Sequence, residues 1–210
     1  MRIIVIYIMI AVLLITGILF STSQLKLQNE QVEAFDIELL SKQTTTVGKI
    51  EEEIIETTKI EDVQISKDMD LTVRTGLSRD DFIELISKLK NDTSGFFEEN
   101  AGMIYDVCEE YSINEIFFCG LIAEESGWNI ASNHRRTNNF ISLMSNGRLI
   151  SYSSVEEGLK VAAQKLHDNY LSSTGKFFHG TTLSGVKVCF CPASSTWVGA
   201  VFGRMQTILK

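Results

Sequence analysis

The sequence predicts a mainly α-helical fold (α+β class) with one small β-hairpin, preceded by an N-terminal transmembrane helix and an acidic stalk. Three observations predict it. Apolar residues recur at helical spacing from residue 77 onward, an Asn-Gly pair separates two short apolar runs, and a long uncharged stretch opens the chain. With 210 residues and 44% hydrophobic content, the chain has room for one packed domain plus appendages.

The N-terminal stretch decides the expected location of the protein. Ile3–Phe20 is uncharged over 18 residues, and as a helix it would measure roughly 27 Å, close to the thickness of a bilayer core. Arg2 precedes it, which favours a cytoplasmic N-terminus and places the rest of the chain outside the cell membrane. We therefore expect residues 1–22 to form a single-pass anchor. A cleaved signal peptide is the alternative, because "STSQ" at 21–24 could serve as a cleavage site, and the protein would then be secreted.

Residues 23–76 are predicted to form an acidic stalk. Acidic side chains outnumber basic ones by more than two to one between residues 26 and 70, and no apolar periodicity is sustained there. This composition is typical of a solvated spacer. The chain from residue 71 onward is close to neutral, and its formal net charge of −8 as a whole argues against a nucleic-acid partner.

The folded domain is predicted to span residues 77–210 and to open with three helices. They are expected over residues 78–89, 94–111 and 113–126. The first two show apolar residues that recur on one face, and the third is almost wholly apolar and ends before Gly127. Ser112 and Glu115 form a capping-box pattern at the start of the third helix.

A hairpin and further helices follow in the second half of the domain. Within residues 138–154, apolar runs flank the Asn-Gly pair at 146–147, which is the strongest short signal for a hairpin. Helices are expected over residues 155–171 and 196–210. The stretch 181–190 is too short to assign.

Four cysteines leave two interpretations open. A disulfide could join the Cys108/Cys119 region to the Cys189/Cys191 region, or Cys119 could be a small core residue. On a strand, Cys189 and Cys191 would point the same way. Their spacings do not match a zinc site, and a thiol-redox role is disfavoured because no Cys-x-x-Cys motif starts a helix.

Glu125 is the candidate for chemistry. It lies in the last turn of an almost wholly apolar helix, just before Gly127. The dipole at a helix C-terminus disfavours an anion, and desolvation raises the pKa of a carboxyl group. A raised pKa suits a general acid near neutral pH, as in the cleavage of a glycosidic bond. Glu124 points about 100° away around the helix, so only one of the pair faces a given groove. The alternative is that both are ordinary solvated residues.

Four motifs carry a resemblance to a known family. They are Glu-Ser-Gly at 125–127, Asn-Asn-Phe at 138–140, Tyr-Ser-Ser at 152–154 and the closing segment with Trp197 before the last helix. They resemble the bacterial glucosaminidase family of peptidoglycan hydrolases. That family belongs to the lysozyme-like superfamily, which includes the soluble lytic transglycosylases. The resemblance covers about two-thirds of the chain, from Leu77 to the C-terminus.

The resemblance implies a lysozyme-like domain that faces the cell wall and cleaves β-1,4 glycosidic bonds of peptidoglycan glycan strands, of the N-acetylglucosaminidase type. It implies Glu125 as the catalytic acid and Tyr152 facing the sugar or orienting that acid. It adds no metal and no cofactor. Tyr170, Phe177, Phe178 and Trp197 could also stack on sugars, but aromatic residues more often belong to the core. The residues expected to bind substrate are Ser126, Trp128, Asn139, Phe140 and Ser142.

Two features leave the reaction open. No Asp or Glu occurs between Ser126 and Val155, so a single-acid mechanism is predicted, in which water gives hydrolysis or the sugar 6-hydroxyl gives an anhydro product. Many relatives continue Asn-Asn-Phe with Gly and Ile, whereas this chain has Ile141 and Ser142. A non-catalytic, membrane-anchored scaffold that binds glycan is therefore the alternative from another class. The oligomeric state is left open.

Overall fold

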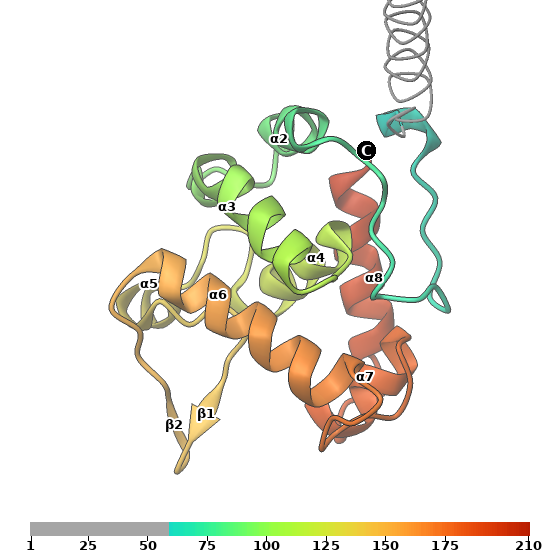
Figure 1. The fold of residues 1–210 in the computed structure, drawn as a ribbon. Helices are drawn as coiled ribbons and strands as arrows, with labels where there is room; N and C mark the ends of the chain where they lie inside the picture. Colours follow the sequence, from blue (N-terminus) through green and yellow to red (C-terminus); the bar gives the residue numbers. More distant parts are fainter. Residues whose placement is uncertain (1–58) are drawn as a thin grey trace, which may run out of the picture. The chain divides into compact units, whose positions relative to one another are not determined.

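The fold is built around one buried helix. In a computed structural model, which describes residues 59–210, helix α4 (Glu115–Ser126) runs through the middle of the domain and other helices cover it (Figure 1). The predicted mainly helical fold with one small hairpin is confirmed for these residues. The other elements are η1 (Ile60–Asp62), α2 (Arg79–Ser87), α3 (Phe96–Glu110), α5 (Ser132–Thr137), β1 (Met144–Ser145), β2 (Arg148–Leu149), α6 (Val155–Leu166), η2 (His167–Leu171), α7 (Leu183–Phe190) and α8 (Trp197–Ile208).

Helix α4 is apolar on every face because packing surrounds it. All its side chains from Glu115 to Ala123 are buried, as is typical of a helix in the middle of a core. The structure corrects the predicted start of this helix. Asn114, rather than Ser112, caps it by accepting a hydrogen bond of 3.0 Å from the backbone N–H of Phe117. Ser112 lies in the preceding turn with a φ of 49°.

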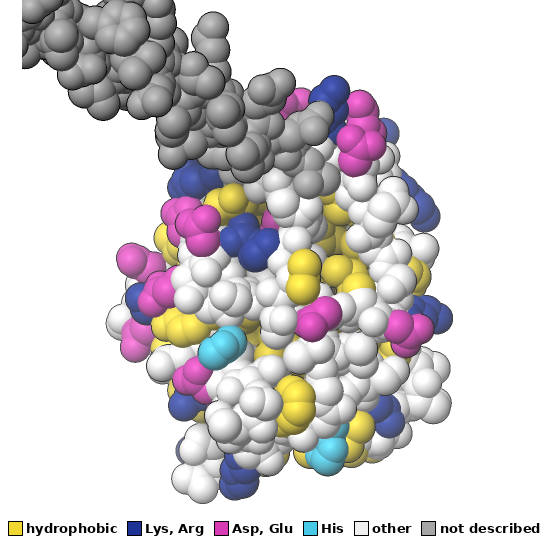
Figure 2. All heavy atoms as spheres, turned by 45° about the vertical axis from the view of Figure 1, so that its right-hand side comes forward, with side chains coloured by type: hydrophobic (Ala, Val, Ile, Leu, Met, Phe, Trp, Pro, Cys, Tyr) yellow, Lys and Arg dark blue, Asp and Glu magenta, His cyan; other side chains and the backbone are white. Residues whose placement is uncertain are grey.

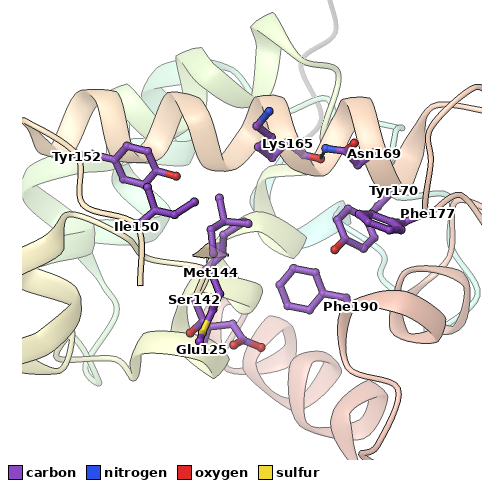
Figure 3. Close-up of a pocket in the computed structure, with 12 residues that line it drawn as sticks. Glu125, Ser142, Met144, Ile150, Tyr152, Lys165, Asn169, Tyr170, Phe177 and Phe190 are labelled. Carbon is purple, nitrogen blue, oxygen red and sulfur yellow. Dashed lines mark hydrogen bonds between the residues drawn. The ribbon is translucent and has the colours of Figure 1, made fainter. Parts of the chain in front are cut away.

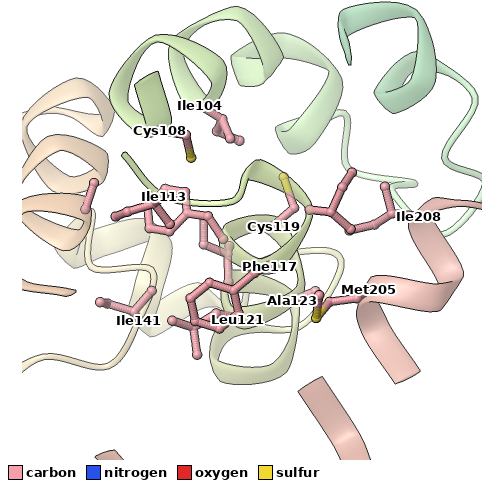
Figure 4. Close-up of a cluster of buried hydrophobic side chains, with 14 of the residues drawn as sticks. Ile104, Cys108, Ile113, Phe117, Cys119, Leu121, Ala123, Ile141, Met205 and Ile208 are labelled. Carbon is pink, nitrogen blue, oxygen red and sulfur yellow. The ribbon is translucent and has the colours of Figure 1, made fainter. Parts of the chain in front are cut away.

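Helix α8 packs closely against α4 (Figure 4). A Cβ atom at Gly120 would lie 2.8 Å from Cγ of Met205 and 3.3 Å from the carbonyl oxygen of Val201, so glycine permits this approach. Helix α3 packs against α2, α4 and α6. The close contact of α4 and α8 sets the end of α4, with Glu125, beside the first turn of α8, with Trp197.

The hairpin confirms the Asn-Gly signal. Strands β1 and β2 pair antiparallel, with Met144 opposite Leu149. Asn146 and Gly147 have φ values of 51° and 75°, the pair of positive angles that a type I′ turn requires. Each strand has only two residues, so the hairpin is an extension of the loop that follows α5.

The helices differ from expectation in three places. Residues 155–171 form α6 and then a single π-helical turn, η2, instead of one continuous helix. The unassigned stretch 181–190 contains α7, which Thr182 caps by accepting a hydrogen bond from the backbone N–H of Gly185. The short helix α5 was not predicted, because its sequence "SNHRRT" has no apolar face.

The domain begins before the predicted boundary at residue 77. The strap, which we define as residues 60–76, packs against the helices. Leu71 is fully buried, and its backbone bonds to Thr181 and Asn114, both at 2.8 Å. Arg74 forms an ion pair of 2.8 Å with Glu115, whose side chain is fully buried. The strap has few apolar residues, and they are separated by polar ones. Its composition is therefore typical of a spacer, which is why the predicted boundary lies at residue 77.

The remaining N-terminal predictions concern residues that the structure does not describe. The predicted span at 3–20, within the anchor at 1–22, and most of the predicted stalk at 23–76 lie outside the described residues. Within residues 59–210, no helix combines the length and the apolar character needed to cross a bilayer.

Of the two interpretations left open for the cysteines, the core role of Cys119 is confirmed, and the disulfide is absent: all four cysteines are free thiols. Cys108 and Cys119 are fully buried core residues, and burial raises the pKa of both thiols. Cys189 lies in helix α7 and Cys191 directly follows it, not on a strand. The strand geometry on which their shared direction was expected is therefore absent at these two residues.

Candidate active site

A cleft of about 390 Å³ opens beside the end of α4 (Figure 3). The loop and hairpin after α5 form one wall, and the end of α6 with η2 forms another. The chain around the end of α7 closes the cleft on a third side. The lining residues are Glu125, Ile141, Ser142, Leu143, Met144, Ile150, Tyr152, Lys165, Asn169, Tyr170, Phe177 and Phe190.

Glu125 enters the cleft from the last turn of α4, where it is partly buried. Burial raises the pKa of its carboxyl group, and hydrogen bonds from Trp197 and Ser142 offset part of that rise. The indole Nε1–H of Trp197 donates to Oε1 of Glu125 at 3.1 Å. Glu124 faces elsewhere and accepts a hydrogen bond of 3.1 Å from Arg204 of α8. The two adjacent carboxylates therefore have different surroundings, as the helical geometry predicts.

Ser142 reaches the cleft through an uncommon backbone conformation. Its φ is 57°, which costs a non-glycine residue roughly 1–2 kcal/mol. The side chain of Asn139 holds this loop: its Oδ1 accepts from the backbone N–H of Leu143 at 2.9 Å, and its Nδ2 donates to the carbonyl oxygens of Leu143 and Ile150 at 2.7 and 2.9 Å. The predicted binding residue Asn139 is thus a buried support of the loop that carries Ser142.

Four residues expected to bind substrate do not line the cleft, and Asn139 is one of them. Ser126 is buried and donates to the carbonyl oxygen of Phe140 at 2.6 Å. The ring of Phe140 is 1% exposed and packs on Phe96 with ring centroids 4.7 Å apart. Trp128 is 8% exposed and packs on Phe97 at 5.5 Å. These residues follow Glu125 in the sequence, but the chain turns back into the core after Gly127.

Tyr152 lines the cleft on a wall away from Glu125 (Figure 3). Its backbone is held at both ends: its N–H donates to the carbonyl oxygen of Thr137 at 2.8 Å, and its carbonyl accepts from Nδ2 of Asn138 at 3.0 Å. Burial raises the pKa of its hydroxyl group. The phenol therefore stays protonated near neutral pH and can donate a hydrogen bond into the cleft.

Three rings form an aromatic wall, which we define as Tyr170, Phe177 and Phe190. The centroid of Tyr170 lies 5.3 Å from that of Phe177 and 5.4 Å from that of Phe190. Phe190 in turn lies 5.6 Å from Trp197, which connects the wall to Glu125. The sequence marked Tyr170 and Phe177 only as possible platforms, and it missed Phe190 because the stretch around it was unassigned.

The π-helical turn η2 brings two adjacent residues, Asn169 and Tyr170, to the cleft. A π-helical turn holds more residues than an α-helical turn, and such turns occur frequently at functional sites. The loop after η2 is tied to it by the backbone N–H of Phe177, which donates to the carbonyl oxygen of Asn169 at 2.8 Å. Lys165 lies four residues before Asn169, so the two side chains share one helix face. This spacing is the signal in the sequence that could have indicated that both line the cleft.

The charges of the cleft are few. Among the residues that line it, Glu125 is the only carboxylate and Lys165 the only cation. The face shown in Figure 2 carries acidic and basic side chains interspersed, without a continuous basic patch. Within the described part of the chain, no group of three or more His, Cys, Asp or Glu side chains could hold a metal ion.

Comparison with solved structures identifies the fold class. The fold is similar to that of S. aureus autolysin E: a catalytic mutant in complex with the disaccharide NAG-NAM matches with a TM-score of 0.54 and 14% identity, over 70% of this chain and 74% of that chain. A complex of autolysin E with a muropeptide matches with a TM-score of 0.53 and 16% identity, over 70% and 73% of the two chains. No family model and no curated protein sequence matches the chain. The predicted resemblance is therefore confirmed for the fold, which is similar to that of autolysin E.

Proposed function

We propose that the protein cleaves β-1,4 glycosidic bonds of peptidoglycan glycan strands, as an N-acetylglucosaminidase, with Glu125 as general acid. One observation carries the proposal: among residues 59–210, Glu125 is the only carboxylate that lines an aromatic cleft, and burial raises its pKa. The fold adds support, because autolysin E structures of similar fold hold NAG-NAM and a muropeptide.

Glu125 acts first in the proposed mechanism. Its carboxyl proton passes to the glycosidic oxygen as the bond from that oxygen to the anomeric carbon breaks, and the leaving sugar keeps the electron pair. Because no second carboxylate from the described part of the chain lines the cleft, the N-acetyl group of the substrate stabilises the positive anomeric carbon. Glu125, now a carboxylate, takes a proton from the water that attacks this carbon.

Neutral groups position the sugar in this proposal. The aromatic wall offers apolar ring faces to the sugar, while Ser142, Tyr152 and Asn169 offer hydrogen bonds. Apolar walls with a few polar groups are typical of ligand sites in proteins. The residues proposed to contact substrate are thus Glu125, Ser142, Tyr152, Asn169 and the aromatic wall.

The location remains a proposal from the sequence. An anchor at residues 1–22 would hold the domain at the outer surface of the cell membrane, in reach of the cell wall. Membrane fractionation of cells that express the full chain tests it. Recovery of a shortened protein in the medium would support the cleaved signal peptide instead.

Zymography on purified cell walls tests the activity, with Glu125→Gln compared against its neighbour Glu124→Gln. We expect the wild type and Glu124→Gln to clear the wall and Glu125→Gln to leave it intact. Clearing by Glu125→Gln would refute the catalytic assignment. Binding of the wild type without clearing would favour the glycan-binding scaffold. Mass spectrometry of the products separates hydrolysis from transglycosylation, because an anhydro product is lighter by one water.

A further inference from the structure

The structure places a buried aromatic donor behind the proposed acid. Trp197 opens helix α8 and is 4% exposed. Its indole Nε1–H donates to Oε1 of Glu125 at 3.1 Å, across 72 positions of the sequence. Trp197 does not line the cleft itself, so it contacts the carboxyl group from the protein side.

We infer that Trp197 is a positioning residue that fixes Oε1 of Glu125 as an acceptor and so keeps the transferable proton on Oε2. The inference rests on the proposed function of Glu125 as an acid. An indole N–H can only donate a hydrogen bond. A protonated carboxyl group has one oxygen that bears the proton and one that only accepts. The oxygen bonded to the indole must be the one that accepts, which leaves Oε2–H for the substrate.

The surroundings hold the indole in this orientation. The backbone N–H of Trp197 donates to Oγ of Ser194 at 3.1 Å, and the ring packs on Phe190 with centroids 5.6 Å apart. The contact of α4 and α8, where Gly120 lies against Val201 and Met205, sets the distance between the two side chains. The donor is therefore in place before substrate binds.

Ser142 contributes differently to the same carboxyl group. Its side chain also lines the cleft, as that of Glu125 does, and a hydroxyl can donate or accept. The indole, which can only donate, keeps the same bond to Oε1 whether Glu125 is protonated or ionised. When the Oε2–H bond breaks and an O–H bond forms on the leaving glycosidic oxygen, the indole bond becomes charge-assisted and stronger.

A variant at position 197 tests this inference through the pH profile. Trp197→Phe removes the N–H and keeps a ring against Phe190. We expect kcat to fall about tenfold or more while KM changes little. We also expect the basic limb of the profile to move to higher pH, because the lost bond favoured the carboxylate.

The other titratable or charged groups around Glu125 are unchanged by this substitution. They lie on its own helix, on α5, on the loop before α6, on α6 with η2, and on α8. They are Glu124, His134, Tyr152, Lys165, Tyr170 and Arg204, of which Arg204 is paired with Glu124. A shift of the basic limb of the pH profile would therefore report the loss of the hydrogen bond from the indole.

Two further variants distinguish the hydrogen bond of Trp197 from the contribution of its ring to packing. β-(3-Benzothienyl)alanine introduced at position 197 keeps the shape of the indole and replaces its N–H with sulfur, so it should shift the limb as Trp197→Phe does. Trp128→Phe alters the other buried tryptophan, which packs on Phe97 and lies under the guanidinium of Arg204, and which the structure shows without a hydrogen bond to Glu125. It should destabilise the fold and leave the position of the limb unchanged.

A ¹³C NMR titration of the Glu125 carboxyl, assigned with Glu125→Gln, gives a readout without substrate. Its titration should move to higher pH in both position-197 proteins. Folded position-197 proteins that keep the wild-type titration and kcat would overturn the inference. If Glu125→Gln is inactive while they keep full activity, only the role of Trp197 fails. If Glu125→Gln clears the wall, the proposed function itself fails.

Discussion

At the scale of single residues, two adjacent glutamates show how surroundings separate chemically identical groups. Glu125 is partly buried beside an indole, and Glu124 pairs with Arg204 at 3.1 Å. Burial raises the pKa of Glu125 above its ordinary value. The folded state therefore binds the Glu125 proton more tightly than the unfolded state does.

This shift predicts how stability depends on pH. A raised folded-state pKa means that the contribution of Glu125 to stability is fully present below the unfolded pKa of about 4.3 and is lost as pH rises through the folded pKa. Glu125→Gln removes that titration, and its amide oxygen can still accept from Trp197. We expect Glu125→Gln to unfold at a higher temperature than the wild type at pH 7.

Thermal unfolding between pH 3 and 8 checks this prediction. The gap between Glu125→Gln and the wild type should close toward pH 3, where both side chains are neutral. Glu124→Gln is the matched control and should show no such gain at pH 7, because it loses a partner of Arg204. A gap that is constant across this range would contradict the assigned shift.

At the scale of secondary-structure elements, α6 packs directly on the turn between α5 and the hairpin. A Cβ atom at Gly158 would lie 1.8 Å from the carbonyl oxygen of Asn138 and 3.2 Å from the ring of Phe140. The side-chain amide of Asn138 bonds to the carbonyl oxygen of Tyr152, and Asn139 supports Ser142 through its loop. Gly158 thus supports the whole cleft wall.

Gly158→Ala should therefore cost about 1–3 kcal/mol of unfolding free energy or more, because the turn must move away from α6. Gly199→Ala is the matched control: a Cβ there meets nothing within 4 Å, in the helix α8. We expect it to be neutral or to stabilise by up to about 1 kcal/mol. Urea unfolding measures both, and equal stability of the two variants would refute the packing argument.

At the scale of the whole molecule, the strap makes the domain larger than its helices. Arg74 is the ion-pair partner of the buried Glu115, and Thr75 adds hydrogen bonds to the same carboxylate. The guanidinium also lies over the ring of Tyr105, 4.2 Å from its centroid. These contacts tie the chain before residue 77 to the start of the central helix.

Breaking the Arg74–Glu115 pair should destabilise the entire domain. Arg74→Met leaves a buried carboxylate without its cation, at an expected cost of about 3–5 kcal/mol. Arg79→Met is the control, because its pair with Asp106 is 49% and 54% exposed and is worth only about 0–1 kcal/mol. Chemical denaturation compares the two. A similar small loss in both would show that the strap is not an integral part of the fold.

The fold was largely predictable where local patterns are strong. The apolar faces of the helices and the Asn-Gly turn each depend on residues close in sequence. The strap and η2 were not predicted because their conformations depend on distant partners, whereas α5 was not predicted because its sequence has no apolar face. The buried Leu71 is one case, since its backbone bonds to Thr181 and Asn114.

The candidate site also has features that depend on local sequence and features that depend on distant contacts. The sequence by itself determined that Glu125 ends an apolar helix, that Glu124 diverges from it and that a hairpin follows, because helix geometry and turn chemistry are local. Only the tertiary structure decided which side chains share the cleft. It turned Trp128 and Phe140 into the core and brought Phe190 and Trp197 to the acid. That outcome depends on how α4, α6 and α8 pack, and packing between distant segments cannot be read from the spacing of residues within one segment.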